Sequence, residues 1–410
     1  MGRDSGHACE PVAANDMKIG LPPAPWQQRT GLAHLLDVLG ASEDQTRYVG
    51  GAVRDTILGL GVQDVDLATK LPPDEVLTRL KAAQIKAVPT GLAHGTVTAV
   101  LPDGPIEITT LRRDIATDGR HATIAYTDDW QADAARRDFT INALFANPKN
   151  GEIYDYFAGL ADLNAGRVAF IGDPLTRIAE DHLRILRFFR FHARFGRGVP
   201  DATALAACGA RANDLMALSR ERIADELLKI LSLPNPLPTV VLMVEHGIFV
   251  PVLPEITSTD GLVVLIKSEA DAGAPAAPLR RLAALLAPDP VLTDRVGARL
   301  KLSKAQRKHL ALLGARQATD AESPRALAYY VGIQAARDRL LLSGHSTSQL
   351  NHWTPPKLPL SGGALVSRGL TVGPKVAAAL HDIEDAWVKG GFAKGAALEA
   401  IIADAVLRWS

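Results

Sequence analysis

RYVGGAVRDTILGLGVQDVDLATK, residues 47–70, is the stretch of sequence that decides the fold. It opens on a short apolar strand that ends at Gly50-Gly51, and a helix is predicted to begin at this pair. Glycine lets backbone N–H groups approach an anion, and the first turn of a helix favours negative charge. We therefore predict a phosphate site here, to which Arg54 adds a cation. A surface ion pair between Arg54 and Asp55 is the alternative.

Two aspartates near the end of this stretch indicate a metal. Asp64 and Asp66 are expected in a short strand, where residues i and i+2 face the same side. Mg²⁺ takes oxygen ligands and shares them with substrate phosphates. Taken alone, the pair also fits a solvated strand end. The chain has no G-x-x-x-x-G-K-[ST] motif, and GLGVQD, residues 59–64, has Asp64 in place of the third glycine of a dinucleotide fingerprint, so we interpret it as a turn.

A further carboxylate, Glu107, would complete a site for two metal ions. It lies inside the predicted strand PIEITTL, residues 105–111, on the side that also carries Thr109 and Leu111, which is a core-like pattern. A buried acid needs a partner. Metal is one solution and an arginine from a neighbouring segment is the other, so the sequence alone leaves the role of Glu107 open.

The chain divides into a mixed α/β part and a helical part. Because several predicted strands lie close together with turn residues between them, we expect a mixed or antiparallel sheet. The predicted fold is α+β: a mixed-sheet head is followed by an all-helical neck, body and tail. Strands are predicted over 47–49, 64–68, 84–90, 95–101, 105–111 and 141–146, and helices over 52–60, 73–83, 129–138 and 173–196. The predicted parts are a loose leader (1–25), a catalytic head (26–150), a helical neck (151–235) and a helical body and tail (236–410).

Composition excludes several classes of protein. The 410 residues carry 45 Lys and Arg against 45 Asp and Glu, so net charge gives no argument for a nucleic-acid partner. Cys9 and Cys208 lack the spacing of a zinc site or a disulfide framework, which favours a reducing compartment, and we expect a cytoplasmic protein. The most apolar run, residues 238–253, is broken by Glu245 and His246, so no membrane span is expected. No protein partner is predicted.

Five segments, in order, resemble the motifs of the class II tRNA nucleotidyltransferase and bacterial poly(A) polymerase family, whose superfamily includes DNA polymerase beta. The resemblance is strong over about residues 30–235 and implies a polymerase-beta-like head. In the third motif the family usually carries Gly-Gly, where this chain has Ala158-Gly159. The motifs are VGGAVRDTILGLGVQDVDLAT (49–69), RRDFTINAL (136–144), YDYFAGLADL (154–163), IAEDHLRILRFFRF (178–191) and SRERIADELLKIL (219–231).

The resemblance implies template-independent addition of C and A, from CTP and ATP, to the 3′ end of tRNA, with release of pyrophosphate. Asp64 and Asp66 would hold two Mg²⁺ ions, one at the primer 3′-hydroxyl and one at the triphosphate. Glu107 stays the candidate for a further catalytic carboxylate because of its place in the predicted strand. The helical tail would hold the tRNA acceptor arm. The residues at the nucleotide-binding positions of the family are Gly50, Gly51, Arg54, Arg136, Arg137, Asp138 and Asn142, and the alternative for the arginines is a helix cap with surface side chains.

The fourth motif implies how the base is chosen. Asp181 and Arg184 are spaced i, i+3, so we expect both on one helix face, where they can pair with the amine and the acceptor of cytosine or adenine. A surface salt bridge is the alternative. Arg187 continues the same stripe of arginines, and Arg220 and Glu226 of the fifth motif are expected to brace this helix.

Residues 112–129 are predicted to form a loop, which in the tRNA enzymes is flexible and supports the switch from C to A addition. Asp118 and Arg120 stand at its supporting positions. Segment 88–100, VPTGLAHGTVTAV, resembles the tRNA enzymes and favours CCA addition. Enzymes that add only A, only CC or poly(A) share the motifs and remain alternatives, as does a non-catalytic RNA-binding relative.

Overall fold

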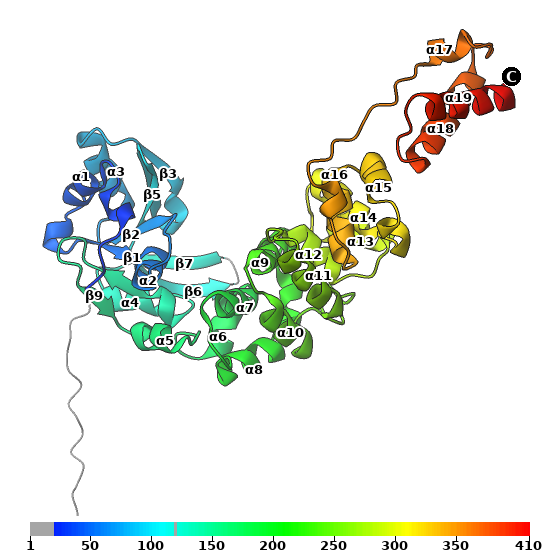
Figure 1. Cartoon of the computed structure of the whole chain (residues 1–410). Helices are drawn as coiled ribbons and strands as arrows, with labels where there is room; N and C mark the ends of the chain where they lie inside the picture. The colour runs from blue at the N-terminus through cyan, green and yellow to red at the C-terminus, as the bar shows by residue number, and fades with distance from the viewer. Residues whose placement is uncertain (1–19, 119–120) are drawn as a thin grey trace, which may run out of the picture. The chain divides into compact units, whose positions relative to one another are not determined.

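The computed structural model describes residues 20–118 and 121–410, and its chain divides into two compact units (Figure 1). The first unit comprises Met1–Arg184 with Phe195–Ala207, and the second comprises Ile185–Arg194 with Cys208–Ser410. Helix α7 (Arg184–Phe195) therefore contributes to both units. The finer division into leader, head, neck, body and tail stays a prediction.

A seven-stranded mixed sheet is the centre of the first unit, with the order β3-β4-β5-β2-β1-β8-β9 (Figure 1). β2 and β5 pair in parallel, whereas the other neighbours pair antiparallel. This confirms the mixed sheet expected from the sequence, and each predicted strand is present with shifted ends. The strands are β1 (Thr46–Val49), β2 (Val65–Thr69), β3 (Ala87–Gly91), β4 (Thr96–Leu101), β5 (Gly104–Thr110), β8 (Leu144–Ala146) and β9 (Ile153–Asp155), the last of which was not predicted.

Alternation along β1 separates the two faces of this sheet. Val49 pairs with Asp66 of β2 and so shares its face, where Val49 belongs to a buried cluster that includes Trp130. Tyr48 points to the opposite face, and its ring meets the ring of Trp26 edge to face at 4.7 Å. The face that carries Asp66 and the face that carries Tyr48 are therefore chemically separate surfaces.

The loop predicted over 112–129 was wrong, because strands cover most of its described residues. β6 (Arg112–Asp118) and β7 (His121–Tyr126) pair antiparallel as a separate two-stranded sheet. The segment is rich in the β-branched residues that fit a pleated strand, and this propensity outweighs its turn residues.

Short helices surround the sheet of the first unit. Those predicted over 52–60, 73–83 and 129–138 are present as α2, α3 and α4, each shorter than expected. The elements are η1 (Pro25–Gln28), α1 (Leu32–Val38), η2 (Ala41–Glu43), α2 (Gly51–Ile57), α3 (Pro73–Ala82), η3 (Leu92–His94), α4 (Trp130–Ala135), η4 (Thr140–Asn142), α5 (Gly159–Ala165) and α6 (Pro174–Glu180), where η denotes a 3₁₀ helix. Helix α8 (Ala202–Ala210) begins in the first unit and ends in the second.

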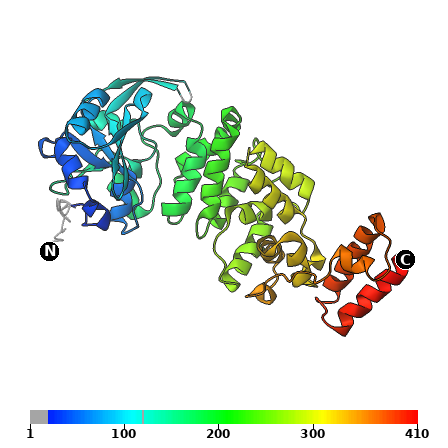
Figure 2. The ribbon, with the colours of Figure 1, turned by 90° about the horizontal axis from the view of Figure 1, so that it is seen from above.

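The second unit is helical throughout its described residues, as expected. Neighbouring helices pack as pairs, such as α13 with α14 and α18 with α19 (Figure 2). None of the helices in the described part of the chain is long and apolar enough to cross a membrane. The elements are η5 (Ala212–Ala217), α9 (Arg220–Ser232), α10 (Leu237–Glu245), α11 (Asp260–Asp271), α12 (Pro278–Ala284), α13 (Pro290–Arg299), α14 (Lys304–Gly314), η6 (Ala318–Ala321), α15 (Pro324–Val331), α16 (Ile333–Leu342), η7 (Ser348–Leu350), α17 (Gly362–Val366), α18 (Pro374–Lys389) and α19 (Ala396–Trp409).

Candidate active site

The glycine pair turns the chain from β1 into α2 in a way that requires Gly50. Its φ is +68° and its ψ −121°, a conformation that L side chains rarely adopt. A Cβ on Gly50 would lie 3.6 Å from Nη1 of Arg137 and 3.6 Å from the carbonyl oxygen of Asn142. A bare backbone therefore lies beside a guanidinium at this turn.

Arg54 is part of a buried chain of polar contacts. Its Nε donates to Oδ1 of Asp55 at 2.8 Å, and its Nη1 donates to Oδ1 of Asn142. Nδ2 of Asn142 in turn donates to Oδ1 of Asp138 at 2.9 Å. The ion pair between Arg54 and Asp55 that the sequence offered as the alternative is present. Both side chains are buried, so its expected position on the surface was wrong. Arg54 thereby fixes the orientation of Asn142.

Three carboxylates gather on the face that Val49 shares. Asp66 on β2 lies directly opposite Glu107 on β5, and Asp64 immediately precedes β2, which begins at Val65. The pKa of Asp66 is raised to about 6, mainly by burial and next by the negative charge of Glu107. The charge of Asp64 also raises this pKa, whereas the positive charge of Arg137 lowers it. Glu107 is exposed, so the core-like burial expected from its strand pattern was wrong: this part of the face is open.

The acidic group fits a divalent cation that is shared with a substrate. Among residues 20–118 and 121–410, no three His, Cys, Asp or Glu side chains form a ready-made metal cage. Mg²⁺, however, commonly uses one or two carboxylates and completes its shell with phosphates and water. Like charges held together raise each other's pKa, as Glu107 and Asp64 do for Asp66, and a bound cation would relieve this repulsion.

Asp133 of α4 holds both arginines of the second motif. Its side chain is 1% exposed, and it accepts from Nε of Arg136 at 2.8 Å and from Nη2 of Arg137 at 3.0 Å. Burial lowers the pKa of Arg136 to about 10, against the effect of Asp133, so this arginine stays charged at neutral pH. Nε of Arg137 is sealed from solvent without a partner among the described residues. The surface arginines considered from the sequence are thus partly buried and anchored.

Asp133 was not predicted, although the sequence carries its signal. It lies three and four residues before the two arginines, which is the spacing of neighbours on a helix.

The fourth motif is a helix break rather than one continuous helix. α6 ends at Glu180, Asp181 is extended (φ −151°), and its Oδ1 accepts from the backbone N of Leu183 at 3.1 Å. An Asp side chain that binds a nearby backbone N–H competes with the helix. The placement of Asp181 and Arg184 on one helix face was therefore wrong, since α7 begins only at Arg184.

Arg184 is held by groups that were not predicted. It donates to the carboxylate of Glu180 and to the carbonyl oxygens of Arg177, at 2.9 Å, and Arg136, at 3.3 Å. Its ion pair in the structure is thus with Glu180. The signal was present as the spacing i, i+4 between Glu180 and Arg184.

The remaining predicted residues of α7 and α9 lie in the second unit. The guanidinium of Arg187 lies 5.3 Å from the ring centroid of Phe191. Nε of Arg190 donates to Oε2 of Glu226 at 2.6 Å, which joins α7 to α9. Arg220 begins α9, and its Nη1 is sealed without a partner among the described residues.

Of the two residues predicted to support the loop, Asp118 ends β6 opposite His121. Arg120 lies outside the described residues.

Comparison with known proteins defines first the class and then the family. Residues 46–169 match the family model "Poly A polymerase head domain", and residues 200–259 match "Probable RNA and SrmB- binding site of polymerase A". These matches define a polymerase-type nucleotidyltransferase head followed by an RNA-binding segment.

Relatives over nearly the full length give the family. The CCA tRNA nucleotidyltransferase 1, mitochondrial, of Mus musculus is 34% identical over 396 residues, 92% of this chain and 90% of that protein. The CCA-adding enzyme of Levilactobacillus brevis is 41% identical over 187 residues, 45% of this chain and 46% of that protein. A crystal structure of the Bacillus stearothermophilus CCA-adding enzyme with CTP has the same fold, with a TM-score of 0.73 and 24% identity, covering 93% of this chain and 99% of that chain. The chain belongs to the CCA tRNA nucleotidyltransferase family, for which a divalent metal requirement is expected.

Proposed function

We propose that this chain adds C and A to the 3′ end of tRNA from CTP and ATP and releases pyrophosphate. One observation within the site carries the proposal. Asp66 and Glu107 lie side by side on one sheet face, and the positive charge of Arg137 lowers the pKa of Asp66. Arg137 is itself held by Asp133. Groups for a cation and for phosphate are thus placed together. The family relatives supply the substrates.

The triphosphate is bound, in this proposal, by the turn at Gly50-Gly51 and by Arg137. Gly50 is buried and its backbone N–H donates to the carbonyl oxygen of Leu144 at 3.0 Å, so it shapes the turn, and the half-buried Gly51 offers its backbone to the phosphate. Arg54 acts indirectly by holding Asn142, which carries a contact to Asp138. Phosphoryl transfer needs positioning and charge more than proton transfer by side chains, which agrees with this set of residues.

We propose that Asp64 and Asp66 hold Mg²⁺, with Glu107 beside them. When bound, Mg²⁺ lowers the pKa of the primer 3′-hydroxyl and offsets the charge of the triphosphate. The backbone pairing of β2 with β1 and β5 fixes the sheet face on which Asp66 lies.

Base choice is assigned to Asp181 and Arg184. Cytosine and adenine present an amine beside an acceptor on the pairing edge, whereas uracil and guanine present an oxygen in place of the amine. A carboxylate accepts from that amine, and a guanidinium donates to the neighbouring acceptor. Glu180 and the carbonyl oxygen of Arg136 hold Arg184 in one orientation, and recognition of a base by hydrogen bonds requires such a fixed guanidinium.

The test uses three tRNA transcripts that end before CCA, after the first C and after CC. Each transcript is incubated with Mg²⁺ and with CTP, ATP or both, and the products are resolved on a sequencing gel. We expect CC from CTP alone on the first transcript, one A from ATP alone on the third, and the complete CCA with both. Products limited to A or to CC, or a long A tail, would replace the proposal with a partial enzyme or a poly(A) polymerase.

We propose the cytoplasm as the compartment, since Cys208 is a buried free thiol and the chain carries only two cysteines. Three relatives are named as mitochondrial enzymes, so the location is measured by fractionation of cells that express the full chain. Recovery in an organelle fraction would overturn the cytoplasmic assignment.

A further inference from the structure

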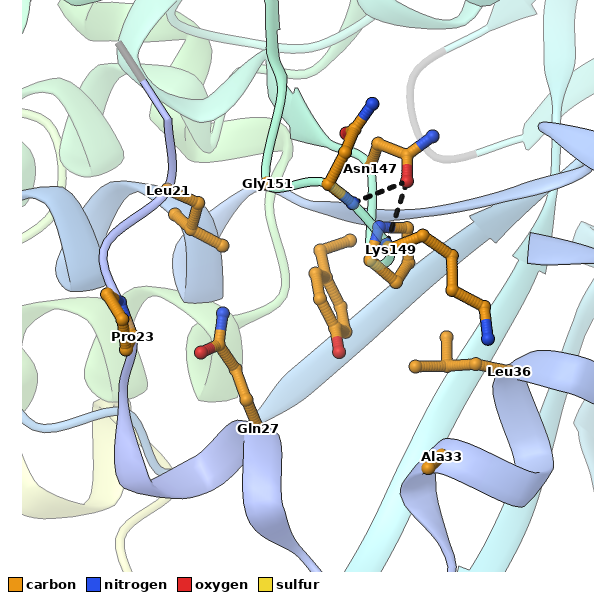
Figure 3. Close-up of a pocket in the computed structure, with 11 residues that line it drawn as sticks. Leu21, Pro23, Gln27, Ala33, Leu36, Asn147, Lys149 and Gly151 are labelled. Atoms are coloured by element: carbon orange, nitrogen blue, oxygen red, sulfur yellow. Dashed lines mark hydrogen bonds between the residues drawn. The ribbon is translucent and has the colours of Figure 1, made fainter. Parts of the chain in front are cut away.

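A cavity of about 340 Å³ lies in the first unit on the side of the sheet opposite to Asp66 (Figure 3). Its walls are the segment before α1, helix α1 and the turn between β8 and β9. Figure 3 shows Leu36 and Ala33 of α1 on one side of the cavity, the side chain of Lys149 reaching toward Leu36, and Asn147 at the opposite end of the view. This volume falls at the lower end of the range of small-molecule pockets, about 300 Å³ and above.

Tyr48 contributes an unpaired hydroxyl to this cavity. The residue is only 3% exposed, and no described residue forms a hydrogen bond with its hydroxyl. The hydroxyl is not sealed from solvent, so it opens into the cavity that Tyr48 lines. Burial raises the pKa of Tyr48 to about 12, so the phenol stays protonated and can donate.

Three amide side chains around the cavity accept backbone hydrogen bonds through their oxygens, while their NH₂ groups make no hydrogen bond to the described residues. Oε1 of Gln27 accepts from the backbone N of Ala24 at 2.9 Å. Oδ1 of Asn147 accepts from the backbone N of Lys149 at 2.8 Å, and Oδ1 of Asn150 accepts from the backbone N of Glu152 at 2.9 Å. The amide NH₂ group of each side chain has two donors. The described residues form no hydrogen bond with these three NH₂ groups.

We propose that this cavity binds a small organic carboxylate with an apolar body. A carboxylate only accepts hydrogen bonds and offers several acceptor sites, which suits the hydroxyl of Tyr48 and the amide NH₂ group of Gln27 as donors. Lys149 lies at the exposed rim, where its ammonium is paired with the carboxylate of Asp37 at 2.5 Å, so a ligand carboxylate would share this ammonium with Asp37. The apolar body would lie against Leu21, Pro23 and Leu36. The site is independent of the proposed nucleotidyl transfer, because Tyr48 and Asp66 face opposite sides of the sheet.

The experiment uses the full chain and benzoate as the probe. Nε1 of Trp26 donates to Oγ1 of Thr56 at 2.9 Å while its ring contacts Tyr48, so its indole N–H resonance in a ¹⁵N-labelled sample reports on the cavity. A Trp26→Phe sample assigns the resonance. We expect benzoate to shift it with saturation at a dissociation constant of about 1 mM or lower. Benzamide should bind more weakly, and benzylammonium, which can only donate, should not bind.

Two variants tie the binding to the cavity. Tyr48→Phe removes only the hydroxyl and should weaken benzoate binding by about fivefold, the effect of one hydrogen bond. Ala33→Phe fills the cavity from an exposed helix position and should abolish the shift, whereas His34→Phe, its exposed neighbour that does not line the cavity, should leave binding unchanged. Thermal unfolding checks that each variant is folded. Absence of a saturable shift up to about 10 mM, well above the expected constant, would overturn the proposal. Equal binding of benzylammonium, or binding that both cavity variants leave unchanged, would also overturn it.

Discussion

The carboxylate of Asp133 lies 3.0 Å from Nη2 of Arg137, and it is also the partner of Arg136, so one buried aspartate orients both arginines of the second motif. A charged partner of this kind restricts a guanidinium to one geometry, which a triphosphate site requires. The positions of these arginines therefore depend on a residue that itself need not touch substrate.

Asp133→Asn keeps the shape of this side chain and removes its charge. We expect the KM for CTP and ATP to rise about tenfold, because the arginines lose their charged anchor, with a smaller change in kcat. Steady-state kinetics on a tRNA that ends before CCA measures the split. Asp128→Asn, an exposed aspartate just before α4, is the control, and an unchanged KM in Asp133→Asn would contradict the positioning role.

Asp64→Ala removes one proposed metal ligand from the edge of β2. We expect nucleotide addition to fall by on the order of 10³-fold or more, because charge stabilisation at the reacting phosphate is lost. Fold and tRNA binding should persist, since Asp64 is exposed and lies outside the strand. Single-turnover addition and filter binding measure the two quantities, with Asp74→Ala, an exposed aspartate of α3, as the control. Wild-type turnover in Asp64→Ala would refute the metal assignment.

Arg184→Ala should blur the choice of base. Incorporation of UMP and GMP relative to CMP and AMP should rise by about tenfold, the effect of losing one charge-assisted contact to the base. Glu180→Gln should act in the same direction but less strongly, since the carbonyl oxygens of Arg177 and Arg136 still hold the guanidinium. The measurement is misincorporation with each nucleotide offered alone. Selectivity retained in both variants would show that the base is read elsewhere.

Exchanging alanine and glycine at positions 158 and 159 should have opposite effects on stability. Ala158 has φ +58°, a conformation that costs alanine about 1 kcal/mol, so Ala158→Gly should leave stability unchanged or raise it by about that amount. A Cβ on Gly159 would lie 2.4 Å from the carbonyl oxygen of Thr140, so Gly159→Ala should destabilise the first unit by roughly 2 kcal/mol or more. Urea unfolding of the two variants tests the pair, and a stable Gly159→Ala would contradict the close approach.

His192 should make stability depend on pH. It is buried on α7, stacked on Phe188 with ring centroids 6.3 Å apart, and burial lowers its pKa. The unfolded chain therefore takes up a proton on this histidine at a higher pH than the folded chain does. Stability should fall as the pH drops below the unfolded value of about 6.5. His192→Phe should reduce the difference in unfolding free energy between pH 7.5 and pH 5.5, whereas His34→Phe, at an exposed site, should not. Equal pH dependence in His192→Phe and the wild type would rule out this role.

The sequence predicted what depends on local pattern. The glycine turn and the strands follow from spacing, because a glycine at a strand end and alternation along a strand have few structural outcomes. The pairing of Asp66 with Glu107 depends on the order of the strands, which spacing does not predict, and Asp64 lies just before β2 rather than within it. Sequence reasoning missed the segments in which two local conformations compete. At Asp181 a side chain that binds a backbone N–H ended the helix, and over 112–129 strand propensity outweighed turn residues.

Anchoring residues were missed for a different reason. Asp133 and Glu180 carry helix spacings to their arginines, but such spacings are common on solvated helices. Only burial distinguishes an anchor from a surface pair, and burial is a property of the folded chain. The same holds for Glu107, whose exposure depends on what covers the sheet.

The parallel pairing of β2 with β5 also has a consequence for how the head folds. Between these strands the chain runs through α3, β3 and β4, so Glu107 reaches Asp66 only after this excursion has closed. Contacts between residues far apart in sequence form slowly, because the entropy of loop closure is lost before they stabilise the chain. A nascent chain that ends after β2 thus carries its glycine turn and both aspartates but no Glu107 beside them. Until this excursion has closed, the head lacks the complete acidic set that is proposed to hold metal.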